Sequence, residues 1–276
     1  MNAHRGRDYP QRKNRLRNLP QAGDNPVNPK GKVAFVTASA RRIGRAITLA
    51  LAQAGANVVI NYRTSAKEAR ATAAEARALG VQALTVQFDM TDYRSAPALI
   101  DQLTRKLGPI DILVNNASLF KQAPVPSGNF TLWHNTIDVI VHTPFYLANA
   151  VAPSMLDRGA GVIINIVDLS AWEAWPGYAA HSVAKAALLA LTRQLALELA
   201  PAVRVNAVAP GPVLPPIRFT EEMIARTAAK TLLNRWGTPE NVAETVLFLV
   251  RNNYITGEYI TVDGGERYGH RKDEAG

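Results

Sequence analysis

The chain has 276 residues, of which 47% are hydrophobic and 19% are charged, and its formal net charge is +9 at pH 7. This length and apolar fraction suffice for one large core, so a single principal domain is expected. Because the chain contains no cysteine, the sequence excludes disulfides, thiolate catalysis and cysteine-ligated metals, and no apolar run approaches the roughly 20 residues needed to cross a bilayer.

Positive charge gathers at the start of the chain. Residues 1–30 contain seven arginines and lysines but only two acidic residues, so they carry +5 of the net +9. They contain almost no large apolar side chains, which predicts a flexible basic N-terminal arm, and a solvated extension is favoured over a binding segment. The remaining charge is too small to indicate nucleic-acid binding. We therefore expect a soluble, cytoplasmic protein with neither nucleic acid nor membrane as a partner.

Apolar patterns of strand and helix type alternate over residues 31–265, and residues 266–276 form a C-terminal tail. The expected strands are residues 32–37, 57–62, 82–88, 110–115, 161–167, 203–208 and 259–262. The expected helices are residues 43–54, 65–79, 92–107, 131–157, 178–199 and 239–252, and residues 214–232 are expected to form a loop. Such alternation predicts an α/β fold, a Rossmann-type doubly wound parallel sheet in a single three-layer αβα domain.

The turn after the first expected strand reads Thr37-Ala38-Ser39-Ala40-Arg41-Arg42-Ile43-Gly44. A strand, a turn and a helix in this order direct backbone N–H groups and the positive helix end at the phosphates of a dinucleotide. The residues expected to contact the cofactor here are Thr37, Ser39, Arg42, Ile43 and Gly44. If the turn requires a positive φ at Ala38, its Cβ costs about 1 kcal/mol.

The end of the second expected strand selects between the two nicotinamide cofactors. An acidic residue there would bind the ribose 2′-hydroxyl of NAD, but the chain has Arg63, Thr64 and Ser65. A cation and two hydroxyls suit a 2′-phosphate, so NADP(H) is the expected cofactor.

Four further motifs follow in order: Phe88-Asp89-Met90-Thr91-Asp92, Asn115-Asn116-Ala117-Ser118, Pro210-Gly211 and Val262-Asp263-Gly264-Gly265. Together with the turn, they resemble the short-chain dehydrogenase/reductase family, and most closely its pteridine reductase branch, over residues 31–265. In the family, glycines usually stand at the positions of Ala38 and Arg42, and the branch has an arginine at the second. The resemblance implies a homotetramer or dimer. It also implies cofactor contacts from Asp89, Met90, Asn116, Ala117, Ser118, Pro210 and Gly211.

The resemblance also implies a catalytic group, in which this chain departs from the family. The family donates a proton from a tyrosine, and a lysine four residues later holds the nicotinamide ribose. Here Lys185 is present, His181 stands at the tyrosine position, and Asp168 stands where serine is usual, as in the pteridine reductases. At the position where the family usually has a helical asparagine, this chain has Ile140.

Two side chains are candidates to replace the missing tyrosine. An imidazole with an ordinary pKa of about 6.5 can donate a proton near neutral pH, so His181 is one candidate donor, tuned by Asp168. Tyr178 is the other, because it precedes His181 by one helical turn.

Aromatic residues point to the substrate. By the resemblance, Phe120 matches the residue that stacks on a pterin ring, and Tyr178 borders the same pocket. Trp172 and Trp175 either line this pocket or pack a subunit contact, and His134 and His142 have no second ligand at metal spacing, so no metal is expected.

The leading hypothesis is NADP(H)-dependent hydride transfer to a small-molecule substrate, either pterin-like or another cyclic compound with a C=N or C=O bond. One alternative is a catalytically impaired dinucleotide-binding protein with a regulatory or structural role. Another is a scaffold that binds no cofactor.

Overall fold

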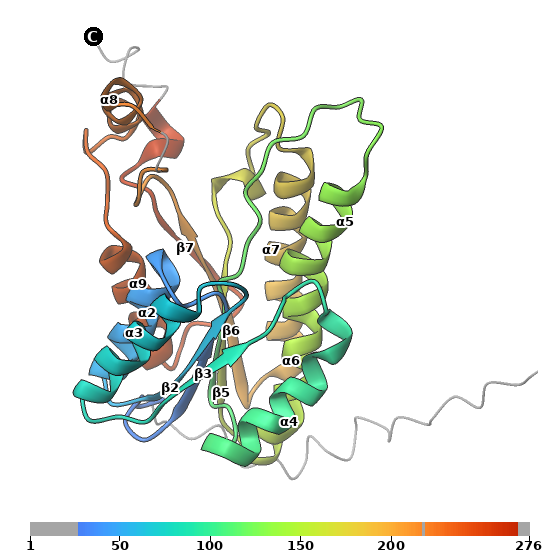
Figure 1. Cartoon of the computed structure of the whole chain (residues 1–276), viewed down its shortest axis with the longest axis vertical. Helices are drawn as coiled ribbons and strands as arrows, with labels where there is room; N and C mark the ends of the chain where they lie inside the picture. Colours follow the sequence, from blue (N-terminus) through green and yellow to red (C-terminus); the bar gives the residue numbers. More distant parts are fainter. Residues whose placement is uncertain (1–26, 217–218, 270–276) are drawn as a thin grey trace, which may run out of the picture.

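A parallel sheet forms the centre of the structure, a computed structural model that describes residues 27–216 and 219–269 (Figure 1). Within these residues the sheet has seven strands in the order β3-β2-β1-β4-β5-β6-β7, and all neighbours are parallel. The strands are β1 (Val33–Val36), β2 (Asn57–Tyr62), β3 (Ala83–Gln87), β4 (Ile112–Asn115), β5 (Gly161–Ile166), β6 (Val203–Pro210) and β7 (Tyr259–Val262). This topology confirms the predicted Rossmann-type fold. Most of the predicted N-terminal arm, and residues 270–276 of the predicted tail, lie outside the described residues.

Helices cover both faces of this sheet and complete the three layers. They are α2 (Arg42–Gln53), α3 (Ala66–Ala78), α4 (Ala96–Leu107), α5 (Thr131–Ile137), α6 (Thr143–Asp157), α7 (Ala179–Leu199), α8 (Glu221–Lys230) and α9 (Pro239–Arg251). Phe35 of β1 packs into a core with α4, α6 and α7, whereas its neighbours Ala34 and Val36 pack into a second core with α2, α3 and α9. Both faces of β1 are therefore buried, which explains its uninterrupted apolar sequence.

The predicted helix over residues 131–157 is interrupted by a wider turn. A π-helical segment, Asp138–His142, joins α5 to α6. Thr131–Asp157 is long and apolar enough to cross a membrane, and it is the one such helix among the described residues. This differs from the expectation that no apolar run approaches that length. Half of its most apolar window is buried inside the protein, as is usual for a core helix.

The expectation of a loop over residues 214–232 is wrong for half of that segment, which forms α8. Thr220 caps this helix, because its side chain accepts a hydrogen bond from the backbone N–H of Met223. None of the residues of α8 is buried, although its sequence is amphipathic. Residues 217 and 218 lie outside the described part of the chain.

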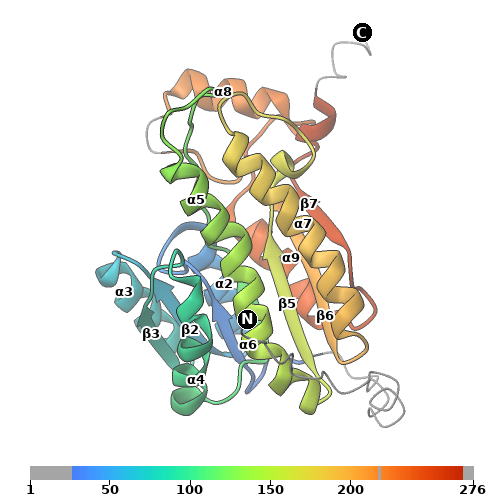
Figure 2. The same ribbon diagram turned by 90° about the vertical axis from the view of Figure 1, so that its right-hand side faces the viewer.

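The carboxyl ends of the strands meet at one end of the molecule. The start of α7, α5 and α8 lie at that same end, as Figure 2 shows. Any site formed by loops after the strands must lie there, since a parallel sheet directs all its strand ends to one edge.

A buried polar chain joins α7 to the sheet. Asn115 at the end of β4 donates its side-chain amide to Asn165 Oδ1 in β5 at 2.8 Å, and Asn165 donates to Thr192 Oγ1 of α7 at 2.9 Å. The Thr192 hydroxyl donates in turn to Leu188 O. All three polar side chains are buried, so each hydrogen bond replaces one that water would otherwise make.

Replacing Asn165 with alanine is expected to lower the free energy of unfolding by about 2–4 kcal/mol, because it leaves the Asn115 amide and the Thr192 hydroxyl with a lost partner in the core. Denaturant unfolding measures this loss. Asn149→Ala is the matched control, since Asn149 is exposed on α6 and should change stability by less than about 0.5 kcal/mol. Equal effects at the two positions would contradict a structural role for the buried chain.

Candidate active site

The strand order reverses between β1 and β4, and this reversal opens a crevice at their carboxyl ends. Thr37, directly after β1, holds the two ends together. Its Oγ1 accepts hydrogen bonds from the backbone N–H groups of Asn116 and Ala117, both at 2.9 Å, and the Asn116 side chain donates to Thr37 O at 2.9 Å. The predicted cofactor residues after β1 and β4 are therefore fixed to one another.

The turn between β1 and α2 adopts a conformation that normally requires glycine. Ala38 has φ = 51° and Arg42 has φ = 56°, both in the left-handed region. Gly44 permits a close approach, since a Cβ there would lie 2.5 Å from Ala38 O and 2.6 Å from Asn116 Nδ2. The chain thus keeps a glycine-type turn with only one of the three glycines.

Hydrogen bonds from β2 support this turn. The backbone N–H of Ala38 donates to Asn61 Oδ1 at 2.8 Å, and the buried Ser39 hydroxyl donates to Val36 O at 2.7 Å while accepting from Asn61 N. Ile43 packs against the apolar core beneath α2. Ser39 and Ile43 therefore stabilise the turn by contacts inside the protein.

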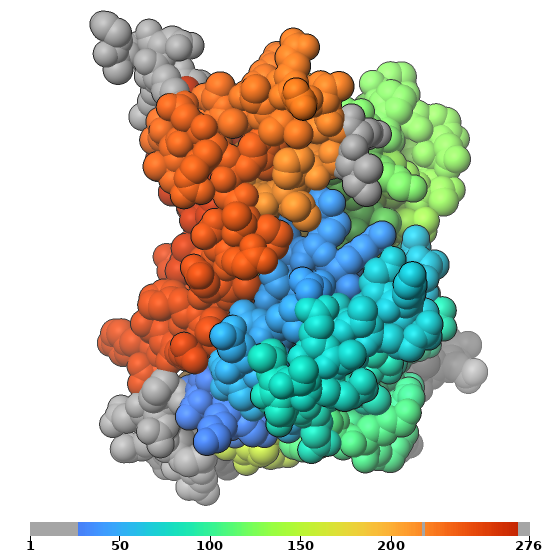
Figure 3. All heavy atoms as spheres, turned by 60° about the vertical axis from the view of Figure 1, so that its left-hand side comes forward, coloured from blue at the N-terminus to red at the C-terminus, as the bar shows by residue number. Residues whose placement is uncertain are grey.

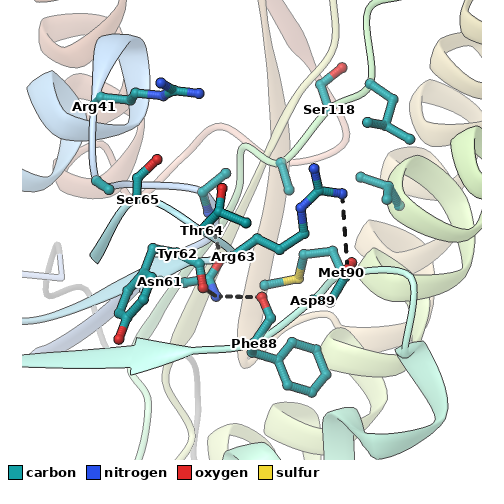
Figure 4. Close-up of a pocket in the computed structure, with 15 residues that line it drawn as sticks. Arg41, Asn61, Tyr62, Arg63, Thr64, Ser65, Phe88, Asp89, Met90 and Ser118 are labelled. Carbon is teal, nitrogen blue, oxygen red and sulfur yellow. Dashed lines mark hydrogen bonds and ion pairs between the residues drawn. The ribbon is translucent and has the colours of Figure 1, made fainter. Parts of the chain in front are cut away.

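A cleft that is partly open to solvent lies between the turn and the ends of β2, β3 and β4. Figure 4 shows the side chains that line the cleft. In Figure 3, α2 and α3 lie next to each other on one face of the molecule. It is lined by Ala38, Ala40, Arg41, Asn61, Tyr62, Arg63, Thr64, Ser65, Phe88, Asp89, Met90, Ala117, Ser118, Leu119 and Val139. Seven of the predicted cofactor residues meet here.

Two arginines line the cleft, one of which sequence reasoning missed. Arg63 extends across it, with Nη1 at 3.9 Å from Asp89 Oδ2, and Arg41 approaches from the turn (Figure 4). Arg42 does not line this cleft; its guanidinium lies 3.4 Å from Leu214 O. The left-handed backbone at Arg42 separates the directions of the two neighbouring arginines, which the sequence Arg-Arg does not reveal.

The second group of predicted residues meets at the start of α7. His181 Nε2 lies 2.7 Å from Asp168 Oδ2, and its Nδ1 lies 3.0 Å from the backbone oxygen of Leu119. Lys185, one helical turn later, donates from Nζ to Ile166 O at 2.7 Å. The side chain of His181 is 2% exposed and that of Asp168 is 18% exposed, so this group is buried and linked to the ends of β4 and β5.

Neighbouring charges perturb the titration of this group. Burial, the largest single effect, raises the pKa of Asp168, but the hydrogen bond from His181, the charges of Lys185 and His181, and the hydrogen bond from Ser170 outweigh it. The pKa of Asp168 therefore lies below its ordinary value. Burial lowers the pKa of Lys185, and the charge of Asp168 only partly offsets this effect.

An aromatic cluster stands beside the buried group. Phe120 and Tyr178 stack with ring centroids 4.5 Å apart, and the rings of Trp175 and His181 meet Phe120 edge to face at 6.1 and 5.0 Å. Phe120 remains 51% exposed. Trp172 packs instead on Tyr259 of β7.

The remaining predicted cofactor residues, Pro210 and Gly211, lie at the end of β6 and not in the lining of the cleft. Gly211 donates its N–H to Val262 O of β7 at 3.0 Å, and a Cβ on Gly211 would lie 2.7 Å from Asp263 Cβ. This glycine is needed for close packing between the segments after β6 and β7.

Comparisons with known proteins agree with this geometry. Residues 37–266 match the family model described as enoyl-(acyl carrier protein) reductase. The chain is 38% identical over 239 residues to the 3-oxoacyl-[acyl-carrier-protein] reductase of Synechocystis sp., an alignment that covers 85% of this chain and 96% of the relative.

Two solved structures resemble the chain over most of its length. FolM alternative dihydrofolate reductase 1 from Brucella canis, complexed with NADP, is 36% identical with a TM-score of 0.82 and covers 87% of this chain and 95% of its own. A blue fluorescent protein from a metagenomic library, in complex with NADPH, is 34% identical with a TM-score of 0.81 and covers 87% and 99%.

Because Ala38 has a positive φ, glycine substitutions at Ala38 and at Ala40 should change the free energy of unfolding in opposite directions. Ala38→Gly should raise the free energy of unfolding by up to about 1 kcal/mol, because glycine relieves the strain of a positive φ. The control Ala40→Gly should lower it by about 0.5–1 kcal/mol, since Ala40 is buried and has no positive φ. Thermal or urea unfolding measures both, and destabilisation by Ala38→Gly would contradict the strained turn.

Proposed function

The chain belongs to the short-chain dehydrogenase/reductase family of NAD(P)-dependent oxidoreductases, and on this basis we propose that it uses NADPH to reduce a C=N or C=O bond in a flat cyclic substrate such as a pterin. Two parts of the site support the proposal, the cleft at the β1–β4 crevice for the cofactor and the aromatic cluster for the substrate. The buried Asp168, His181 and Lys185 stand beside this cluster.

The cleft fits the adenosine end of NADP(H). Arg41, Arg63, Thr64 and Ser65 offer the cations and hydroxyls that a 2′-phosphate requires, while Asp89 stands at the edge expected for adenine. The close packing of Gly44 onto the turn brings the start of α2 to the position for the pyrophosphate. When bound, NADPH supplies the hydride. Lys185 would orient the nicotinamide end, and homologous structures containing NADP or NADPH support the same cofactor here.

The exposed ring of Phe120 is the observation that carries the substrate class. The Phe120 ring, which is half exposed, stacks with Tyr178 and meets Trp175 edge to face, so this cluster would bind a flat ring by stacking. The similarity to an alternative dihydrofolate reductase favours a pterin-like ring over an open-chain ketone. His181 and Tyr178 are the two candidate proton donors.

A second function, a cofactor-binding protein with little or no turnover, is favoured by one observation. Both ring nitrogens of His181 face oxygen atoms of the protein, and the side chain is 2% exposed. If this histidine were the required donor, its proton would be poorly accessible to a substrate.

We also propose that the chain assembles as a homo-oligomer through its long helices. Phe145 on α6 and Val183 and Leu197 on α7 are exposed apolar side chains. Such side chains are more stable when a partner subunit covers them.

Oxidation of NADPH in the presence of dihydropterins tests the proposal. We expect turnover with dihydropterins and a kcat/KM at least about tenfold lower with open-chain ketones of similar size, a difference of about 1.4 kcal/mol. Phe120→Ala should raise KM for the ring substrate about tenfold through loss of stacking, whereas the control Trp172→Ala, on the Tyr259 side, should leave KM unchanged. Preference for an open-chain ketone would contradict the substrate class. Cofactor binding without turnover on any substrate would support the second function.

A further inference from the structure

We infer that His181 donates hydrogen bonds from both ring nitrogens and so positions the substrate wall, and that Tyr178 donates the proton to the substrate. The inference rests on the proposed reductase function and assigns roles to two side chains within that same site. It follows from the hydrogen-bonding partners of each ring.

The first step concerns the Nδ1 atom of His181. This atom lies 3.0 Å from the backbone oxygen of Leu119. A carbonyl oxygen only accepts hydrogen bonds, so the contact is favourable only when Nδ1 carries a hydrogen. A neutral histidine in this position would therefore have a bare Nε2.

The second step concerns Nε2, which faces Asp168 Oδ2 at 2.7 Å. The other carboxylate oxygen, Oδ1, already accepts from the backbone N–H of Ser170 at 3.0 Å and from the Ser170 hydroxyl. Burial raises the pKa of Asp168, but the hydrogen bond from His181, the charges of Lys185 and His181, and the hydrogen bond from the Ser170 hydroxyl outweigh it and keep this pKa below its ordinary value. The carboxyl group of Asp168 is therefore ionised. An ionised carboxylate has no proton to give, and Nε2 must carry a hydrogen as well.

The third step is the consequence for proton transfer. Both N–H groups of His181 are directed at protein oxygens, and the ring is almost fully buried. Loss of either proton would leave a buried oxygen without its donor and the carboxylate of Asp168 with less compensation. The charged groups around the ring are Asp168, at the start of the short helix Leu169–Ala171, and Lys185 on α7. His181 is therefore a positioning residue.

His181 positions the backbone segment that carries Phe120. The imidazolium ties Leu119, after β4, to Asp168, after β5, and to the first turn of α7. The Phe120 ring also contacts the edge of the His181 ring, with centroids 5.0 Å apart. Hydrogen bonds at this junction would hold the exposed face of Phe120 in one place.

Tyr178 has the properties of a donor that His181 lacks. Its ring stacks on Phe120, one residue before α7 begins. In the part of the chain that the structure describes, its hydroxyl makes no hydrogen bond, so the proton is available to a substrate on the aromatic cluster. The carbon of the C=N or C=O bond would accept the hydride that NADPH supplies when bound. The Tyr178 hydroxyl gives its proton to the nitrogen or oxygen, and the tyrosinate takes a proton from water.

The charge state of His181 can be measured without any substrate. In protein labelled with 15N-histidine, both ring nitrogens of His181 are expected to show the chemical shifts of protonated nitrogens at neutral pH, with assignment by the absence of these signals in His181→Phe. In Asp168→Asn the Nε2 signal should become that of an unprotonated nitrogen at the same pH. A ring nitrogen without a hydrogen in the wild type at neutral pH would overturn the positioning role.

Kinetic variants test the donor. Tyr178→Phe keeps the stacked ring and removes only the proton, so kcat should fall about 100-fold or more, while NADPH affinity stays within about twofold. His181→Gln should instead raise KM for the ring substrate and leave kcat within about twofold of the wild type, because it disturbs the position of Phe120 and keeps the donor. The control Tyr259→Phe, beside Trp172, should leave both constants unchanged.

The possible failures are distinct. A full kcat in Tyr178→Phe would overturn the donor assignment and leave the reductase function intact. Absence of turnover in the wild type with every ring substrate would overturn the reductase function and the donor together, and the nitrogen shifts would still decide the state of His181.

Discussion

The whole site depends on the reversal of strand order between β1 and β4. Because the chain leaves these neighbouring strands toward opposite faces of the sheet, their carboxyl ends open a crevice that no crossover helix fills. Thr37 fixes the two rims of the crevice through its hydrogen bonds to Asn116 and Ala117. The cleft on one side and Phe120 of the aromatic cluster on the other belong to segments that start at these rims.

Burial makes the second half of the site sensitive to single changes. Asp168, His181 and Lys185 are ionisable groups in a largely dry environment, and each is stabilised by partners that the others or the backbone supply. Removing one partner leaves the rest without compensation. The buried chain from Asn115 through Asn165 to Thr192 holds α7 against the sheet and so maintains these distances.

The fold could be predicted from alternating apolar patterns, because strands buried on both faces and amphipathic helices leave strong signals in the sequence. The prediction of a loop over the whole segment 214–232 missed helix α8, although the sequence of this helix is amphipathic. Arg63, Thr64 and Ser65, which were predicted to bind the cofactor, do line one cleft, but the presence of Arg41 there in place of Arg42 depends on a backbone angle. Likewise, the sequence indicates that His181 is near Asp168 by resemblance, yet its second partner is the backbone oxygen of Leu119, which no side-chain pattern reveals.

The most direct test of a 2′-phosphate site in this cleft is calorimetry, with the affinities for NADPH and NADH measured on the wild type, Arg41→Ala and Arg63→Ala. Arg105→Ala on the exposed face of α4 is the control with the same change of net charge. If the cleft binds the 2′-phosphate, the wild type and the control should bind NADPH at least about tenfold more tightly than NADH. Both cleft variants should lose most of this preference and keep their affinity for NADH. Equal affinities in the wild type, or a preference that survives both cleft substitutions, would contradict a 2′-phosphate site in this cleft.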